Sequence, residues 1–289
     1  MTIHNASAVL HMVKPPVAEA PLAAVPLVRV QQCRHGLMVY FPHDVYIGGA
    51  LERYGEYVQA ELDLLLSYVQ PGDIVVEVGA NIGCDTVPLA QRVTDAGRVF
   101  AFEPQRIIYQ MLCANLAING IWNVIAERGA LGAAPGIMQV PPVDYAQIGN
   151  FGGVPLQETG AEPVQVIALD AYRLTRCDLL KIDVEGMELA VLQGAADTIA
   201  RLRPVIYCEN DREEKSAALI AYLRELGYEL HWHLPRMFNP DNWRRNPSND
   251  YGDIVSVNML CLPQEKGLTS PLPLVHGGLA TVSSDKVLA

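Results

Sequence analysis

The clearest chemical pattern in the sequence is the turn Glu77-Val-Gly-Ala-Asn-Ile-Gly83. An apolar run, Ile74–Val78, leads into it, and a second apolar run, Val99–Phe102, ends at Glu103. Strand, glycine turn, helix, strand and acid is the order in which a parallel α/β sheet builds a nucleoside pocket. Because the spacing is not the Gly-x-Gly-x-x-Gly of pyrophosphate-binding turns, we expect a nucleoside without phosphates, and S-adenosylmethionine (SAM) fits that description.

A plain βαβ unit is the alternative reading of the same residues. In that case the tight turn and the acid at the strand end would have no ligand. Four features in the right order and at workable spacing favour the SAM pocket over this alternative.

The elements that must position these residues alternate between strands and helices, which predicts an α/β fold with a doubly wound, mostly parallel sheet. Strands are expected at Val164–Ala168 and Leu179–Ile182, helices at Tyr54–Tyr68 and Leu189–Ala200, and a terminal antiparallel pair at the C-terminal end. The expected divisions are a flexible arm (1–27), a hairpin and helix extension (28–70), the main domain (71–263) and a mobile tail (264–289).

Composition limits the classes of partner. The net charge of −11 and the sequence pI of about 5.1 disfavour nucleic acid. The six cysteines form no Cys-x-x-Cys pair, which argues against structural zinc and fits a reduced, cytoplasmic setting. The stretch from Val9 to Val30 is interrupted by prolines and charges, so we expect neither a membrane span nor a signal peptide there.

Three blocks resemble the FkbM family of SAM-dependent methyltransferases: Glu77–Gly83, Phe102–Pro104 and, most distinctively, Leu180–Ala195. The resemblance implies a class I, Rossmann-like methyltransferase fold and, usually, O-methylation of a hydroxyl on a sugar or secondary metabolite. It does not fix the substrate. The chain departs from the family pattern at Cys208-Glu-Asn-Asp211, which adds polar groups, and at Glu77, where the family often has Asp.

Ligands in such sheets bind outside the carboxyl ends of the strands, where the strand order reverses. We expect the turn to face the methionine half of SAM, with its backbone amides on the carboxylate. Glu103 should take the ribose, and Ala130 with Leu131 should flank adenine. The expected cofactor-binding residues are Glu77, Gly79, Asn81, Gly83, Glu103, Pro104, Ala130, Leu131 and Asp183, with Tyr54 and Glu56 closing over the cofactor or, alternatively, serving only a surface helix.

Methyl transfer to an alcohol needs a general base or a metal that lowers the pKa of the hydroxyl. Asp183 is the leading candidate for base or ligand. Together with Glu209 and Asn210 it would form an oxygen-only set suited to Mg²⁺ or another divalent cation. Lys181 lies in an apolar strand and should pair with a carboxylate, in either a structural or a catalytic role.

The polar and aromatic loop 231–246 is the other candidate region, since its composition suits a hydroxylated ligand such as a sugar. Within it, His233 could be an ordinary hydrogen-bonded residue, a substrate-binding residue or base, or, with His231, a metal ligand.

The favoured function is thus O-methylation of a small-molecule or glycan substrate. N-methylation, a non-catalytic SAM-binding or partner-binding module, and a nucleotide-dependent oxidoreductase are the alternatives; the missing Gly-x-Gly-x-x-Gly disfavours the last. A homo-oligomer is compatible with the sequence, which does not fix the oligomeric state.

Overall fold

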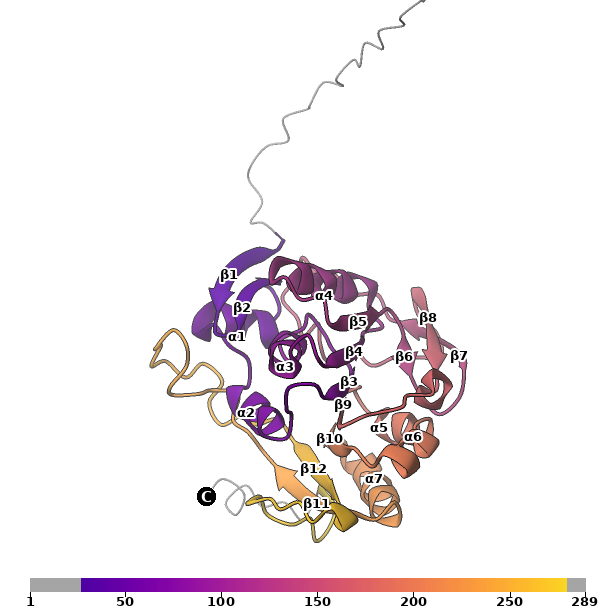
Figure 1. Cartoon of the computed structure of the whole chain (residues 1–289). Helices are drawn as coiled ribbons and strands as arrows, with labels where there is room; N and C mark the ends of the chain where they lie inside the picture. Colours follow the sequence, from indigo (N-terminus) through magenta and orange to yellow (C-terminus); the bar gives the residue numbers. More distant parts are fainter. Residues whose placement is uncertain (1–26, 280–289) are drawn as a thin grey trace, which may run out of the picture.

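A seven-stranded sheet forms the centre of the computed structural model, which describes residues 27–279 (Figure 1). Its strand order is β11-β12-β10-β9-β3-β4-β5, and β12 runs antiparallel to both of its neighbours while β10, β9, β3, β4 and β5 are parallel. This arrangement confirms the predicted doubly wound, mostly parallel sheet with a terminal antiparallel pair. The strands are β3 (Ile74–Val78), β4 (Arg98–Phe102), β5 (Val124–Glu127), β9 (Leu179–Ile182), β10 (Val205–Glu209), β11 (Tyr228–His233) and β12 (Asn258–Pro263).

Helices cover both faces of the sheet, which separates two large apolar clusters; a third, smaller one contains Tyr54 and Tyr251. One cluster packs under α2 (Gln59–Ser67), α3 (Thr86–Val93) and α4 (Arg106–Ile118). The other packs under α5 (Glu188–Gln193), α6 (Ala196–Leu202) and α7 (Glu213–Glu225). The four-residue strand β9 is buried at every position, as expected for a central parallel strand.

The N-terminal extension is a hairpin followed by two helices. Strands β1 (Arg29–Cys33) and β2 (Gly36–Tyr40) pair antiparallel, and α1 (Ile47–Tyr54) follows them. The helix expected over 54–68 is confirmed as α2 (Gln59–Ser67), but its expected start is wrong. Tyr54 ends α1, which is capped by Gly55 in a left-handed conformation with φ of 71°. A glycine in that conformation is a common helix terminator.

A small second sheet lies beside the main one. It contains β6 (Ala130–Leu131), β7 (Gly136–Val140) and β8 (Glu162–Ile167) in the order β6-β8-β7. The strand expected at 164–168 thus belongs to this sheet and not to the central one. The helix expected at 189–200 is likewise divided into α5 and α6.

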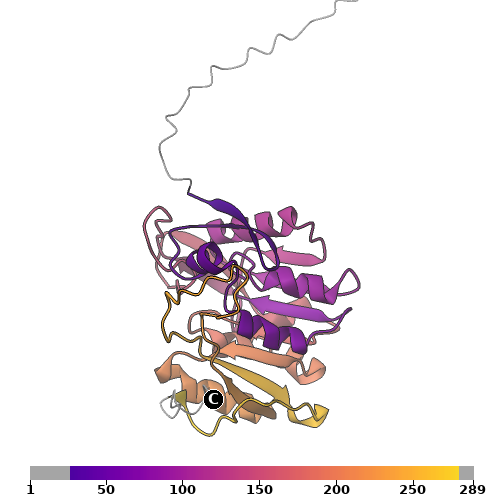
Figure 2. The ribbon, with the colours of Figure 1, turned by 90° about the vertical axis from the view of Figure 1, so that its left-hand side faces the viewer.

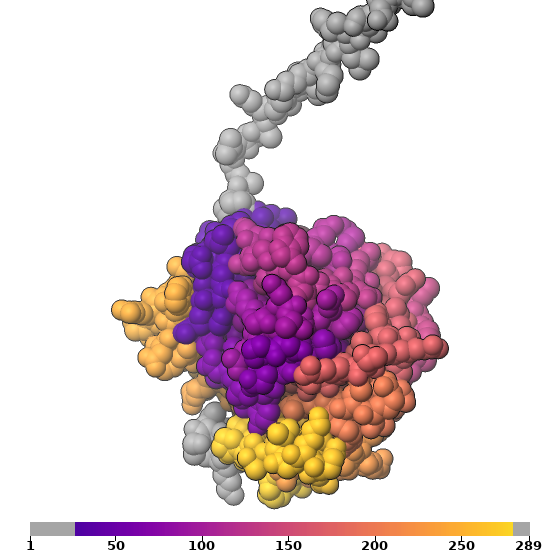
Figure 3. All heavy atoms as spheres, in the orientation of Figure 1, coloured from indigo at the N-terminus to yellow at the C-terminus, as the bar shows by residue number. Residues whose placement is uncertain are grey.

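Two long segments outside the regular elements pack against the rest of the domain. Loop 234–257, light orange in Figure 1, extends toward α1, where the Arg244 amide donates to the Tyr54 carbonyl over 3.1 Å. The described part of the expected tail, 264–279, packs back on β11 (Figure 2, Figure 3). Val275 is buried, and the Trp232 backbone amide donates to the Pro273 carbonyl over 2.8 Å. Up to residue 279, then, this stretch is held by the sheet and differs from a free tail.

The flexible arm expected at 1–27 lies, apart from its last residue, outside the described residues. Among residues 27–279, no helix has both the length and the apolar character needed to cross a bilayer.

Two asparagines one helical turn apart on α4 hold the hairpin against the domain. Buried Asn115 accepts from the Val39 amide (2.6 Å) and donates to the carbonyls of Val39 (3.0 Å) and Ile82 (2.8 Å). Half-buried Asn119 makes the same pair of contacts with Leu37 nearer to solvent. The two residues therefore form one clamp on β2, with an inner and an outer arm.

We expect Asn115→Ala to lower the free energy of unfolding by about 2–4 kcal/mol, because buried backbone groups lose their partners. Asn119→Ala is the matched control and should cost about 1 kcal/mol or less, since water can replace its contacts. Urea denaturation of both variants measures the difference. Equal losses would mean that burial does not set the strength of the clamp.

Candidate active site

A cavity of about 360 Å³ opens at the carboxyl ends of β3, β4 and β9. β4 lies on one side of β3 and β9 on the other, so this is the point where the strand order reverses. Most of the residues singled out in the sequence line it: Glu77, Gly79, Asn81, Glu103, Pro104, Ala130, Leu131, Lys181, Asp183 and Glu209.

Gly79 sets how closely the ends of β3 and β9 approach each other. Its φ is +87°, and a Cβ added there would lie 1.8 Å from the Asp183 carbonyl oxygen. The Asp183 amide in turn donates to the Val78 carbonyl over 2.9 Å. Only glycine satisfies both the backbone conformation and this close approach.

The turn amides are engaged within the chain. Those of residues 79–83 all donate to acceptors of the turn or of β4 and its end, so they are not directed at a ligand carboxylate as the sequence suggested. The acceptors are the Phe102 carbonyl for Gly79 and Ala80 (both 3.0 Å), Glu103 Oε2 for Asn81 (3.0 Å), Asn81 Oδ1 for Ile82 (2.8 Å) and the Ala80 carbonyl for Gly83 (2.9 Å).

Glu103 ties the turn to the end of β4. Its Oε2 accepts from the backbone amide of Asn81 over 3.0 Å, and its Oε1 accepts from the backbone amide of Gln105 over 2.8 Å. Burial raises the pKa of Glu103 to about 7, although these two amides pull it down. Each oxygen keeps a lone pair, so this fixed carboxylate at the cavity wall can still accept hydrogen bonds from a diol.

Glu77 lies deeper, with 1% of its surface exposed. Its Oε2 accepts from Thr86 Oγ1 over 2.6 Å, which connects β3 to the first turn of α3. Burial raises the pKa of Glu77 to about 8 against the opposing effect of Lys181. Glu77 therefore contributes to the cavity floor while it is fixed from behind.

Lys181 and Asp183 form the centre of the floor. The Lys181 ammonium is buried and lies 3.1 Å from Asp85 Oδ2, 3.7 Å from Asp183 Oδ2 and 3.9 Å from Glu61 Oε1. The Asp183 side chain is 43% exposed and is the member of this group that reaches solvent. The pairing expected for Lys181 thus involves several carboxylates at once.

The oxygen-only set differs from the expected one. Asp183, Glu185 and Glu209 each bring a carboxylate oxygen within 4.8 Å of the others. The side chain of Asn210, the third expected member, is buried, and its Nδ2 donates to the Met259 sulfur over 3.3 Å. Burial and the neighbouring carboxylates raise the pKa of Glu209 to about 11, and its Oε2 has no hydrogen-bond partner within residues 27–279.

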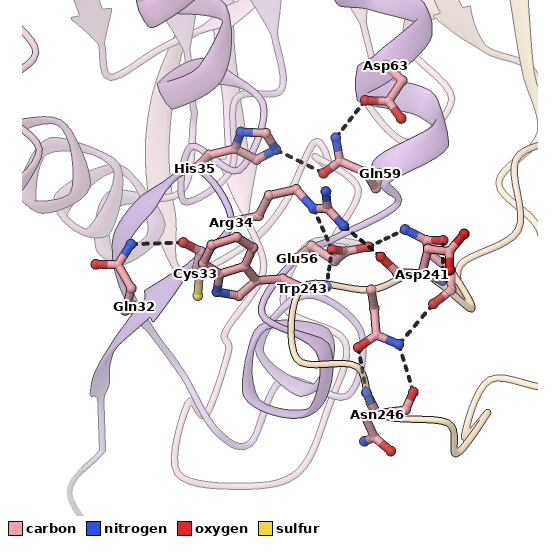
Figure 4. Close-up of polar contacts among 12 residues, drawn as sticks. Gln32, Cys33, Arg34, His35, Glu56, Gln59, Asp63, Asp241, Trp243 and Asn246 are labelled. Atoms are coloured by element: carbon pink, nitrogen blue, oxygen red, sulfur yellow. Dashed lines mark hydrogen bonds and ion pairs between the residues drawn. The ribbon is translucent and has the colours of Figure 1, made fainter.

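Three predicted cofactor residues lie away from the cavity. Glu56 is buried among Arg34, Asn239 and the Trp243 amide, which all donate to its carboxylate (Figure 4). Tyr54 packs in the aromatic cluster beneath loop 234–257 and donates to the Ser248 carbonyl. Gly83 has φ of +91° and faces Leu112, so its part is to shape the turn. For Tyr54 and Glu56 the contacts favour the structural alternative.

His233 also lies elsewhere. It lines a second hollow with Arg236, Phe238 and Asn239, and its Nδ1 is 2.8 Å from the hydroxyl of buried Tyr207. Burial lowers the pKa of His233 to about 4, so the ring is neutral near pH 7. His231, which the metal alternative pairs with His233, is engaged with the Leu272 carbonyl and Glu229.

Sequence reasoning missed the residues that close the cavity from outside the sheet. Tyr57 comes from the segment between α1 and α2, and Asn150 with Gly152 comes from the β7–β8 connection. Phe151 anchors that connection by packing on Phe41. The one available signal was the aromatic and glycine content of these loops, which does not say where they fold.

The Gly79 geometry generates a stability prediction. Gly79→Ala should cost about 3 kcal/mol or more of unfolding free energy, because it adds a backbone collision to the positive φ. Gly72→Ala is the control: its φ is +90°, but the nearest atom to an added Cβ is 4.0 Å away. It should cost only about 1 kcal/mol. Thermal and urea unfolding measure both, and equal costs would contradict the role of the Asp183 contact.

A pH dependence follows from Glu77. Its folded pKa of about 8 exceeds the ordinary value of 4.5, so its ionisation costs stability in the folded state. The stability present below pH 4.5 should be lost as the pH rises to about 8. Glu77→Gln should flatten that part of the pH–stability curve, and Glu158→Gln, at an exposed glutamate, should leave it unchanged. An unaltered slope in Glu77→Gln would contradict the shift.

The chain is similar in sequence to known methyltransferases. A hexuronic acid methyltransferase, AglP, of Haloferax volcanii is 26% identical over 152 residues, which cover 51% of this chain and 60% of the relative. The methyltransferase sdnD of Sordaria araneosa is 27% identical over 154 residues, covering 42% and 59%. The chain thus spans less than two thirds of these relatives' own lengths.

A solved FkbM methyltransferase from Methylobacillus flagellatus aligns with a TM-score of 0.45 at 17% identity, over 70% of this chain and 50% of that one. The family model for the methyltransferase FkbM domain matches residues 77–230, which run from the end of β3 into β11. Because this match covers more than half of the chain, the chain belongs to the FkbM methyltransferase domain family.

Proposed function

We propose that this protein is a SAM-dependent methyltransferase that methylates a hydroxyl of a sugar or secondary metabolite. The observation that carries the proposal is the cavity at the strand-order reversal, which has a fixed carboxylate, Glu103, on one wall and a partly exposed carboxylate, Asp183, on its floor. The hexuronic acid acceptor named for the Haloferax relative supports a sugar as acceptor class. N-methylation is the alternative for the same site.

The residues present fit SAM. Glu103 can accept hydrogen bonds from ribose hydroxyls, and Ala130 with Leu131 offers a buried apolar surface for adenine. SAM supplies a methyl group on a sulfonium, which is transferred in line to a nucleophile. Because the amides of 79–83 are engaged, we assign the turn the task of shaping the wall.

Asp183 is the proposed general base. Its side chain reaches solvent within the cavity, and it can take the proton that the acceptor hydroxyl loses as the new bond forms. The β7–β8 connection and loop 234–257 supply residues at the cavity mouth, where an acceptor would enter. A divalent cation on Asp183, Glu185 and Glu209 is the second way to activate the hydroxyl, in place of the Asp183–Glu209–Asn210 set.

Two substitutions should separate binding from turnover. Glu103→Ala removes the ribose acceptor and should weaken SAM binding by about 100-fold, corresponding to two hydrogen bonds to a charged group. Asp183→Asn should leave SAM affinity within about threefold and reduce turnover by about 100-fold or more. Calorimetry and a radiolabelled methyl-transfer assay measure the two effects.

Asp197→Asn, at an exposed carboxylate paired with Arg201, is the control for both assays. Full turnover in Asp183→Asn would remove this residue as base or ligand. Turnover that disappears on EDTA treatment and returns with Mg²⁺ would favour the cation over the general base.

A further inference from the structure

A row of polar side chains crosses the otherwise apolar centre of the sheet. Glu77, Lys181 and Tyr207 are register partners on the adjacent parallel strands β3, β9 and β10, and all three are at most 3% exposed. A buried lysine is costly unless it is paired. The row therefore calls for a structural or functional explanation beyond packing.

The partners of Lys181 come from three different elements. Glu61 lies in the first turn of α2, Asp85 immediately precedes α3, and Asp183 follows β9. Their carboxylate oxygens lie within 3.9 Å of the ammonium, which has three protons to donate. The side chains of Glu61 and Asp85 are 9% and 12% exposed, against 43% for Asp183. Asp85 and Asp183 both line the cavity, Asp183 is the more exposed of the two, and Glu61 lies behind them.

Glu61 is itself held in place by a residue of strand β12. Its Oε2 accepts from Asn258 Nδ2 on β12 over 3.1 Å, and the same Nδ2 lies 2.8 Å from Ser256 Oγ at the cavity mouth. A Glu61 side chain fixed in this way can hold the ammonium from behind. The N-terminal extension thereby reaches the centre of the site although Glu61 does not line the cavity.

The charges support a permanent cation at this position. Burial lowers the pKa of Lys181, but the surrounding Asp85, Asp183 and Glu61 more than reverse the effect and hold it well above its usual value. A lysine that stays charged is poorly suited to carry a proton back and forth. It is well suited to fix an anion at a set place.

Resting on the proposed function, we infer that Lys181 is a positioning residue: clamped by Glu61 and Asp85, its ammonium holds the Asp183 carboxylate at the cavity floor. Helix α2 of the extension is then a necessary part of the catalytic apparatus. The sequence left a structural and a catalytic role open for Lys181, and this inference gives it a supporting role for the catalytic base.

The test compares Glu61→Gln with the control Asp63→Asn. Both variants remove one carboxylate from α2, but only Glu61 is paired with the Lys181 ammonium. The glutamine can keep the Asn258 contact only by turning its amide group toward Lys181. The assay uses radiolabelled SAM and methyl glycosides of neutral hexoses above pH 8, because burial raises the pKa of Glu61 to about 8 and its carboxylate is ionised above that pH. Glu61→Gln should then lower kcat about tenfold and leave acceptor KM and SAM affinity within about twofold. Asp63→Asn should leave all three unchanged.

Crystal structures supply a readout that needs no turnover. In the wild type and in Asp63→Asn, Asp183 Oδ2 should lie within contact distance of Lys181 Nζ; in Glu61→Gln and Lys181→Met it should move or become disordered. An unmoved Asp183 in Glu61→Gln together with an unchanged kcat would overturn the inference. A wild type that neither binds SAM nor transfers methyl would defeat the proposed function, and the Asp183 position would still decide the positioning role.

Discussion

The close approach of β3 and β9 at Gly79 is the constraint on which the site depends. With no side chain at this position, the chain leaves β3 in a left-handed conformation and passes directly over the Asp183 backbone. This contact brings the turn, the end of β4 and the end of β9 to one edge of the sheet. The cavity is the space that remains where the helices diverge on either side of that edge.

A second constraint is electrostatic. Glu61, Glu77 and Glu103 are buried around the cavity, and each has a raised pKa because its ionised form loses hydration. One buried ammonium, Lys181, compensates part of this cost. Holding these groups in place lowers folding stability, as is common at sites where a protein binds a ligand or carries out a reaction.

The parts of the fold that the sequence could predict are local. Apolar runs bounded by glycine or proline located the central strands, and the order of turn and acid located Gly79 and Glu103 on one cavity. The FkbM resemblance and the doubly wound sheet are confirmed by the family match and by the strand order. These features are encoded in short windows whose residues act together.

The parts that could not be predicted depend on contacts distant in sequence. Glu56 was a candidate to close over the cofactor, yet its buried carboxylate accepts from the backbone amide of Trp243, far along the chain. The strand at 162–167 was placed in the wrong sheet, because periodicity identifies a strand and not its partner. Glu61 has the pattern of an ordinary amphipathic helix residue, and only the tertiary fold places it beside Lys181.

Calorimetric titration of the purified protein with SAM, followed by NAD, tests the central claim most directly. The account predicts micromolar binding of SAM, with and without EDTA, and no binding of NAD. Absence of SAM binding, or tighter binding of NAD, would contradict it. The turn at Gly79 would then be scaffold or a site for another nucleoside.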